Sequence, residues 1–349
     1  MAKISPKDNY LKLVNGGHPE YVPYYTMMGE EYMGEAATKM MMANIFPSDG
    51  FVDGGKDMWG VPHKADRTMG IAMPDTSITI LEDIFDWRDV IKFPEPVPNL
   101  DLHKQYEDSL RMFNIDREKS AVTLSPGFSP FQELMGLMGF TGGLVAIMEE
   151  PEEVSEMLNA MIDHIEPYFD RILDEFKPDI WYLVDDTAAR QTPFFSPQVY
   201  HDLFLPLYRR LAKPANDRGI PIQFHNCGRC EDFLDDMIDY GVTLWDPAQE
   251  TNKLLDVKEK YKGKLSIIGA WDWDIHMPKN YPEYSEEELR QSIRDCIDTY
   301  APGGGFGMIC WPISYKGDPV IKEVNRIIRD ECHWYAREFY GYTADGPRP

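Results

Sequence analysis

The segment Pro221-Ile222-Gln223-Phe224-His225-Asn226-Cys227 is a short apolar run that ends in residue types that bind metals. Successive side chains of an extended chain point to opposite faces, so residues two apart share a face. We therefore expect a β-strand over residues 221–226 that presents His225 and Cys227 on the same side. An imidazole nitrogen and a thiolate sulfur placed in this way can bind one metal ion.

Short apolar runs of this kind alternate with longer helical patterns along most of the chain. Three helical patterns have clear starts: Pro151 opens one to about Phe176, Ser196-Pro197 opens one to Leu211, and Ser285 opens one to Tyr300. The predicted strands occupy residues 22–28, 56–60, 121–125, 179–185, 221–226, 242–246, 265–270 and 305–311.

Eight strands separated by helices predict an α/β fold of the (β/α)8 barrel (TIM barrel) type. A doubly wound open sheet is the competing topology, but no strand is followed by the Gly-x-Gly-x-x-Gly motif of dinucleotide-binding sheets. We expect one barrel domain over residues 1–349, with extra loop and helix material over about 1–115. The tail over residues 343–349 is expected to be mobile.

The composition limits the partners and the cellular location that we expect. The 349 residues are 43% hydrophobic, which is enough for a large core, and 59 acidic against 35 basic residues give a net charge of −24. Such a charge disfavours nucleic acids and anionic membranes as partners. Five cysteines without disulfide-like spacing and a start without an apolar leader predict a cytoplasmic protein. The apolar stretch 134–148 contains four glycines and is too short to span a bilayer.

A third thiol, Cys310, ends the glycine-led apolar run 303–310. With His225 and Cys227 it would supply three nitrogen and sulfur ligands from two strand ends, and three protein ligands leave the open position of a catalytic zinc. Two alternatives remain: Cys230 could replace Cys310 through Cys-x-x-Cys geometry, or His225 and Cys227 could simply pack. The fourth zinc ligand and the role of Cys230 are not fixed by the sequence.

The chain resembles the uroporphyrinogen decarboxylase superfamily over nearly its whole length. The shared motifs are Ser125-Pro126-Gly127, Val184-Asp185-Asp186 with Ser196-Pro197 after it, His225-Asn226-Cys227-Gly228 and Ile268-Gly269-Ala270-Trp271. The superfamily is built on a (β/α)8 barrel and includes porphyrinogen decarboxylases and zinc-dependent corrinoid methyltransferases. In the methyltransferase branch, His-x-Cys is followed far downstream by Cys, so the resemblance implies zinc ligation by His225, Cys227 and Cys310.

The decarboxylase branch fits less well because its substrates carry many carboxylates, which its members pair with arginines near the N-terminus. The first hundred residues here contain only Arg67 and Arg88. Burying several carboxylates without cations would be costly.

The ends of the barrel strands offer candidate substrate contacts, because barrel enzymes place their chemistry there. Asp185 and Asp186 are candidates to orient a substrate hydroxyl or protonate a leaving group, although they could merely cap a loop. Asp246 and Asp272 lie at the same ends. Aromatic and Met side chains suit a flat apolar substrate such as a methoxylated aromatic. The predicted substrate-binding residues are Tyr25, Met27, Trp59, Phe128 and Trp271.

These observations predict a zinc methyltransferase that moves a methyl group between a small substrate, such as a methoxylated aromatic that is O-demethylated, and a corrinoid (cobalamin). The corrinoid motif Asp-x-His-x-x-Gly is absent, since the nearest match over residues 274–279 lacks the glycine, so the corrinoid is expected on a partner protein. The alternatives are a methylcorrinoid-to-thiol methyltransferase, a uroporphyrinogen-type decarboxylase and a non-catalytic metal-binding barrel. Donor, acceptor, direction and oligomeric state are not fixed by the sequence.

Overall fold

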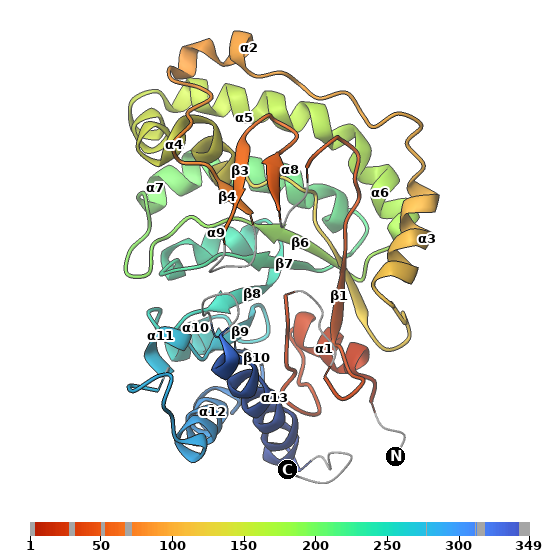
Figure 1. Cartoon of the computed structure of the whole chain (residues 1–349), viewed down its shortest axis with the longest axis vertical. Coiled ribbons are helices and arrows are strands. Elements are labelled where there is room, and N and C mark those ends of the chain that lie inside the picture. Colours follow the sequence, from red (N-terminus) through yellow and green to blue (C-terminus); the bar gives the residue numbers. More distant parts are fainter. Residues whose placement is uncertain are drawn as a thin grey trace.

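The centre of the protein is a curled parallel sheet of seven strands in the order β1-β5-β6-β7-β8-β9-β10, surrounded by helices (Figure 1). The computed structural model describes residues 4–27, 32–49, 53–66, 72–276, 278–310, 312 and 318–341. The strands of this sheet are β1 Thr38–Met41, β5 Ala121–Leu124, β6 Ile180–Val184, β7 Ile222–His225, β8 Val242–Ala248, β9 Ser266–Ala270 and β10 Phe306–Ile309.

The segment around Tyr24 extends this sheet beyond β10. Tyr24 forms an isolated parallel bridge with Met308, and the backbone N–H of Tyr25 donates to the carbonyl of Met308 at 2.8 Å. The N–H of Met308 in turn donates to the carbonyl of Pro23 at 2.8 Å. The first part of the chain thus lies beside the last strand, as a TIM-barrel-like sheet requires. The fold class predicted from the sequence is confirmed.

Two predicted strands are wrong in detail. Residues 56–60 do not form a barrel strand: β2 Gly54–Lys56 belongs to a small antiparallel sheet with β3 Pro62–Ala65 and β4 Ala72–Pro74. The barrel position is taken by β1, which pairs with β5 from Thr38 to Met41 although Thr-Lys-Met-Met is not a typical strand sequence. Within the predicted strand 22–28, the described residues form only the bridge at Tyr24. Met28, Trp311 and the tail 343–349 lie outside the described residues.

The predicted helices are present, with interruptions. The pattern over 151–176 forms α5 Pro151–Ile165, a 3-10 turn Glu166–Tyr168 and α6 Phe169–Phe176. The pattern after Ser196 forms α7 Pro197–Val199, a π-helical segment Tyr200–Phe204 and α8 Leu205–Asn216. The pattern after Ser285 forms α12 Glu286–Tyr300, and Ser285 caps its first turn by accepting from the backbone N–H of Glu288. The other helices are α2 Trp87–Val90, α3 Leu102–Met112, α9 Leu234–Asp239, α10 Leu254–Lys260, α11 Trp273–His276 and α13 Pro319–Phe339.

Helix α4, Pro130–Glu149, is the one helix in the described parts of the chain that is long and apolar enough to cross a membrane. Its backbone is broken at Gly139, where φ is 71° and ψ is 161°. Leu134 and Leu137 are fully buried in the protein core. The helix therefore packs as part of the barrel's outer layer.

Helix α1, Pro6–Val14, packs against the inside of the barrel. Its Tyr10, Leu13 and Val14 are fully buried and form an apolar cluster that is separate from the large cluster between sheet and helices. The strand residues that complete this inner cluster are Tyr25, Ala121, Ile180, Leu244, Ile268 and Ile309. Because these side chains come from six separate segments, α1 helps to hold the strands together.

Truncation of the inner cluster is expected to destabilise the protein. Leu13→Ala should lower the free energy of unfolding by about 2–5 kcal/mol, because a fully buried leucine leaves a cavity. The exposed neighbour Lys12 provides the control, and Lys12→Ala should cost less than about 1 kcal/mol. Urea unfolding measures both. Equal losses in the two variants would show that α1 does not pack inside the barrel.

Candidate metal centre

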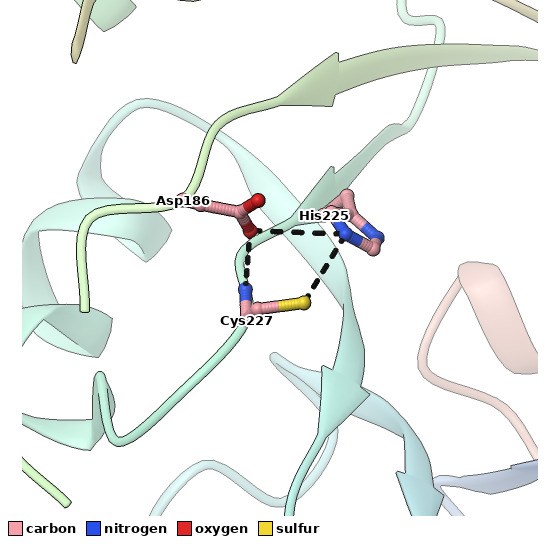
Figure 2. A group of neighbouring side chains, drawn as sticks. All are labelled: Asp186, His225 and Cys227. Carbon is pink, nitrogen blue, oxygen red and sulfur yellow. Dashed lines mark hydrogen bonds and ion pairs between the residues drawn. The ribbon is translucent and has the colours of Figure 1, made fainter. Parts of the chain in front are cut away.

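Three possible metal ligands meet at the carboxyl ends of β6 and β7 (Figure 2). His225 ends β7, Cys227 follows two residues later, and Asp186 follows β6. The ligand atoms of Asp186, His225 and Cys227 all lie within 4.8 Å of one another, and no other such group occurs among the described residues. His225 Nε2 lies 3.4 Å from Cys227 Sγ and 3.8 Å from Asp186 Oδ1. The predicted common face of His225 and Cys227 is present.

Asn226, between the two β7 ligands, fixes the loop that carries Asp186. It is fully buried, and its Oδ1 accepts from the backbone N–H of Thr187 at 2.9 Å while its Nδ2 donates to Thr187 Oγ1 at 2.9 Å. The backbone N–H of Cys227 donates to Asp186 Oδ1 at 3.0 Å. These bonds join the end of β7 to the loop after β6, so the position of Asp186 follows from that of Cys227.

Gly228 allows the loop after β6 to lie close to the end of β7. Its φ is +87°, and a Cβ built on it would lie 2.5 Å from the carbonyl oxygens of Ala188 and Ala189. Any other residue would push the loop away, so glycine at this position supports the approach of Asp186 to Cys227.

Asp246 orients the ring of His225. Its Oδ1 lies 2.9 Å from His225 Nδ1, and the carboxylate is fully buried at the neighbouring strand β8. A carboxylate on Nδ1 directs the other ring nitrogen, Nε2, toward a metal, which is a common arrangement in metal sites. The sequence placed Asp246 only at a strand end; in the structure it lies behind the histidine.

The charges of this group suit a metal cation. Burial alone would lower the pKa of His225, but Cys227 and Asp246 beside it together raise this pKa well above its usual value. Burial raises the pKa of the Cys227 thiol, while His225 beside it opposes the shift. Oxygen, nitrogen and sulfur donors of these three types are all found in zinc sites. The donor set therefore fits zinc.

Cys310 does not lie in this group. Ile309 belongs to the inner cluster, whereas Phe306, Met308 and Cys310 belong to the outer cluster between sheet and helices. The alternation along β10 thus turns Cys310 away from the barrel interior. Burial, and then a hydrogen bond with Cys332 of α13, raises the pKa of Cys310. The third candidate ligand in the structure is Asp186, which the sequence analysis assigned to proton transfer or substrate orientation.

Cys230, the alternative ligand, also lies outside the group. It is fully buried, and its Sγ donates to the carbonyl of Asn226 at 3.4 Å. This contact closes the turn after Cys227, so a structural role accounts for Cys230.

Comparison with known proteins identifies the family. The sequence model of the uroporphyrinogen decarboxylase (URO-D) family matches residues 57–308. The chain belongs to the uroporphyrinogen decarboxylase family. The resemblance predicted from the motifs is therefore confirmed. No curated protein sequence matches the chain.

Among solved structures, the chain is similar to a methyltransferase from Methanosarcina mazei, with a TM-score of 0.61 and 10% identity over 97% of this chain and 100% of that one. At this identity the likeness shows a shared fold. A phosphotriesterase homology protein from Escherichia coli (TM-score 0.31, 13% identity, 64% of this chain and 72% of that one) is too distant to support an argument. The same holds for a uronate isomerase from Bacillus halodurans (0.28, 12%, 69% of each chain).

Asp185 and Asp186 are adjacent but have different surroundings. Asp185 is fully buried, and it accepts from the backbone N–H groups of Phe131 and Gln132 at 2.9 and 3.1 Å and from the Tyr208 hydroxyl at 2.8 Å. It therefore anchors the start of α4, and burial raises its pKa to about 7. The side chain of Asp186 is 40% exposed and reaches the candidate metal centre. Asp186 is thus the better placed of the two for chemistry.

The predicted substrate contacts are mostly packed. Tyr25 lies in the inner cluster, and Met27 packs at its edge. Trp59 and Phe128 are buried with ring centroids 6.2 Å apart, and Trp271 is buried with its ring stacked on that of His276. The structure does not join these five residues into one surface, and their substrate role stays a prediction.

The orientation of His225 by Asp246 predicts a strong effect on metal affinity. Asp246→Asn should weaken zinc binding by about 10- to 100-fold, because the amide no longer holds the Nδ1 proton as a carboxylate does. Asp272→Asn is the matched control, since Asp272 is also buried at a strand end but bonds the backbone of Glu250 instead. Competition with a chromogenic chelator gives both dissociation constants. An unchanged constant in Asp246→Asn would contradict the assigned orientation.

Proposed function

We propose that this member of the uroporphyrinogen decarboxylase family is a zinc-dependent methyltransferase that acts with a corrinoid protein. The observation that carries the proposal is the convergence of Asp186, His225 and Cys227 at the carboxyl ends of two barrel strands. Barrel enzymes place their active sites at this end. The fold shared with the Methanosarcina mazei methyltransferase supports the reaction class.

We assign the zinc ligands to Asp186, His225 and Cys227. Three protein ligands leave a position for a reactant, as in catalytic zinc sites. The sequence analysis predicts Cys310 as the third ligand, and it remains the alternative to Asp186. To bind, its thiol would have to turn from Cys332 into the barrel, so substitutions at Asp186 and Cys310 distinguish the two ligand sets.

The reaction proposed is methyl transfer from a methyl ether, with a methoxylated aromatic as the substrate class. When bound, zinc would supply a Lewis acid for the ether oxygen. The bond between methyl carbon and oxygen would break, with the methyl group passing to the reduced corrinoid as acceptor and the oxygen keeping the electron pair. Asp246 keeps the His225 ring in place during this step, and the loop bonds of Asn226 hold Asp186 against the site. A proton from solvent completes the phenol.

A thiol is the second candidate reactant at the same position, as methyl acceptor from the methylated corrinoid. With the Cys227 thiolate, the Asp186 carboxylate and a neutral His225, the zinc site would carry no net charge, and a thiol that binds to the zinc would still be deprotonated to the reactive thiolate. Consumption of a methyl ether would show that the protein methylates the corrinoid. Consumption of a thiol would show that it demethylates the corrinoid.

Decarboxylation of a porphyrinogen is less well supported. Of the two arginines in the first hundred residues, Arg88 bonds Glu153 at 2.9 Å and also pairs with Glu156, both on the helical layer. It is therefore not available to a substrate carboxylate. Arg67 lies outside the described residues.

Substitution of the ligands tests the proposal. The protein is incubated with zinc, free cob(I)alamin and a panel of methoxybenzenes and thiols, and the conversion between cob(I)alamin and methylcobalamin is followed by its spectrum. Cys227→Ser should slow the conversion by more than about 100-fold, because loss of a direct ligand should exceed the effect of an outer partner. Cys296→Ser is the matched thiol control and should keep the wild-type rate. Conversion by Cys227→Ser at the wild-type rate would disprove the proposed function.

The same assay distinguishes the two candidates for the third zinc ligand, Asp186 and Cys310. Asp186→Asn should reduce the rate as strongly as Cys227→Ser, whereas Cys310→Ser should not. The reverse result would assign the third position to Cys310 and show that the end of β10 rearranges in the working enzyme.

A further inference from the structure

A continuous chain of buried hydrogen bonds connects helix α1 to the metal-site histidine. The Tyr10 hydroxyl donates to Gln223 Oε1 at 2.9 Å, although the two residues are 213 positions apart in the chain. Gln223 Nε2 donates to Asp246 Oδ2 at 2.6 Å, and Asp246 Oδ1 lies 2.9 Å from His225 Nδ1. Tyr10, Gln223 and Asp246 have no exposed surface. The helix inside the barrel thus reaches His225 through three side chains.

The hydrogen bonds of this chain all run in one direction, which Asp246 sets and Tyr10 supports. A glutamine amide can turn by half a rotation and exchange its oxygen and nitrogen. Because the Tyr10 hydroxyl donates to Oε1, the amide nitrogen of Gln223 must face the Asp246 carboxylate. In the opposite orientation the amide oxygen would face the negative carboxylate. The Asp246 carboxylate thus sets the amide orientation, because it only accepts, and the Tyr10 hydroxyl stabilises that orientation by donating to Oε1.

Asp246 depends on hydrogen-bond donors because its carboxylate is fully buried. Besides His225 and Gln223, it accepts a hydrogen bond from the Tyr182 hydroxyl at 3.2 Å. Tyr25 and Tyr10 also face it, and burial raises the pKa of both phenols so that they stay neutral donors. Within the described residues, no lysine or arginine pairs with Asp246. A buried carboxylate held only by hydrogen bonds moves when one of its donors is lost.

We propose that Tyr10 and Gln223 are positioning residues that set the orientation of His225, and with it the metal affinity of the site, from within helix α1 and strand β7. The inference rests on the metal-binding part of the proposed function and not on methyl transfer. Neither residue belongs to the group of candidate ligands, and both act through Asp246. The packing of α1 inside the barrel thereby supports the metal site as well as the fold.

Two variants and one control test this proposal in the full-length protein. Tyr10→Phe removes only the hydroxyl, and Gln223→Met removes the amide at similar volume. Ser266→Ala is the control: Ser266 Oγ is buried and donates to the carbonyl of Leu13 at 2.8 Å, so it also binds α1 to a strand, but it is not among the hydrogen-bond donors to the Asp246 carboxylate. Zinc dissociation constants come from chelator competition, and stability from urea unfolding.

We expect Tyr10→Phe to weaken zinc binding by about two- to tenfold, the effect of one net hydrogen bond, and Gln223→Met by about tenfold or more. Ser266→Ala should change the dissociation constant by less than about twofold at a comparable loss of stability. Equal changes of zinc affinity in Tyr10→Phe and Ser266→Ala would overturn the proposal, because they would reduce it to a general effect of α1 docking.

A second measurement does not depend on metal. Nitrogen-15 NMR of the histidine rings in zinc-free protein reports the hydrogen bond at His225 Nδ1. Its resonance should shift in Tyr10→Phe and Gln223→Met and stay in place in Ser266→Ala. If wild-type protein binds no zinc, the proposed function fails while this shift still tests the positioning chain. An Nδ1 resonance that stays in place in both variants overturns the inference.

Discussion

The bond between Asp246 Oδ1 and His225 Nδ1 is the interaction on which the site depends. It crosses from β8 to β7, it is buried, and it determines which ring nitrogen faces Cys227 and Asp186. Without it, the ring could rotate and the three ligand atoms would no longer converge. The candidate metal centre therefore needs a rigid pair of neighbouring strands, and the parallel sheet provides one through the register that places His225 opposite Asp246.

The same requirement explains how the rest of the barrel is arranged around the site. The inner cluster with α1 fixes the strands from within, and the large cluster fixes them to the helices from outside. Asp185 joins the start of α4 to the end of β6, one residue before the candidate ligand Asp186. Buried contacts on both sides thus hold the two strand ends at the spacing that a small ion requires.

Much of the fold could be predicted from the sequence because six barrel strands are apolar runs with ordinary strand composition. The strand Thr38–Met41 was not predicted, since its alternation is weak and its place is decided by pairing with β5. The common face of His225 and Cys227 could be predicted because it needs only the two-residue period of a strand. The orientation of Cys310 could have been predicted in the same way: Phe306, Met308 and Cys310 share one face, and the apolar Phe and Met mark it as the side under the helices. Asp186 could not be placed as a ligand in advance, because its approach depends on the turn at Gly228 and the bonds of Asn226.

The most direct test of this account is X-ray absorption at the zinc edge of protein reconstituted with one equivalent of zinc. The account predicts one sulfur neighbour at about 2.3 Å together with nitrogen and oxygen neighbours at about 2.0–2.2 Å. Two sulfur neighbours would contradict the ligand set of Asp186, His225 and Cys227, and failure to retain zinc would contradict the metal centre itself.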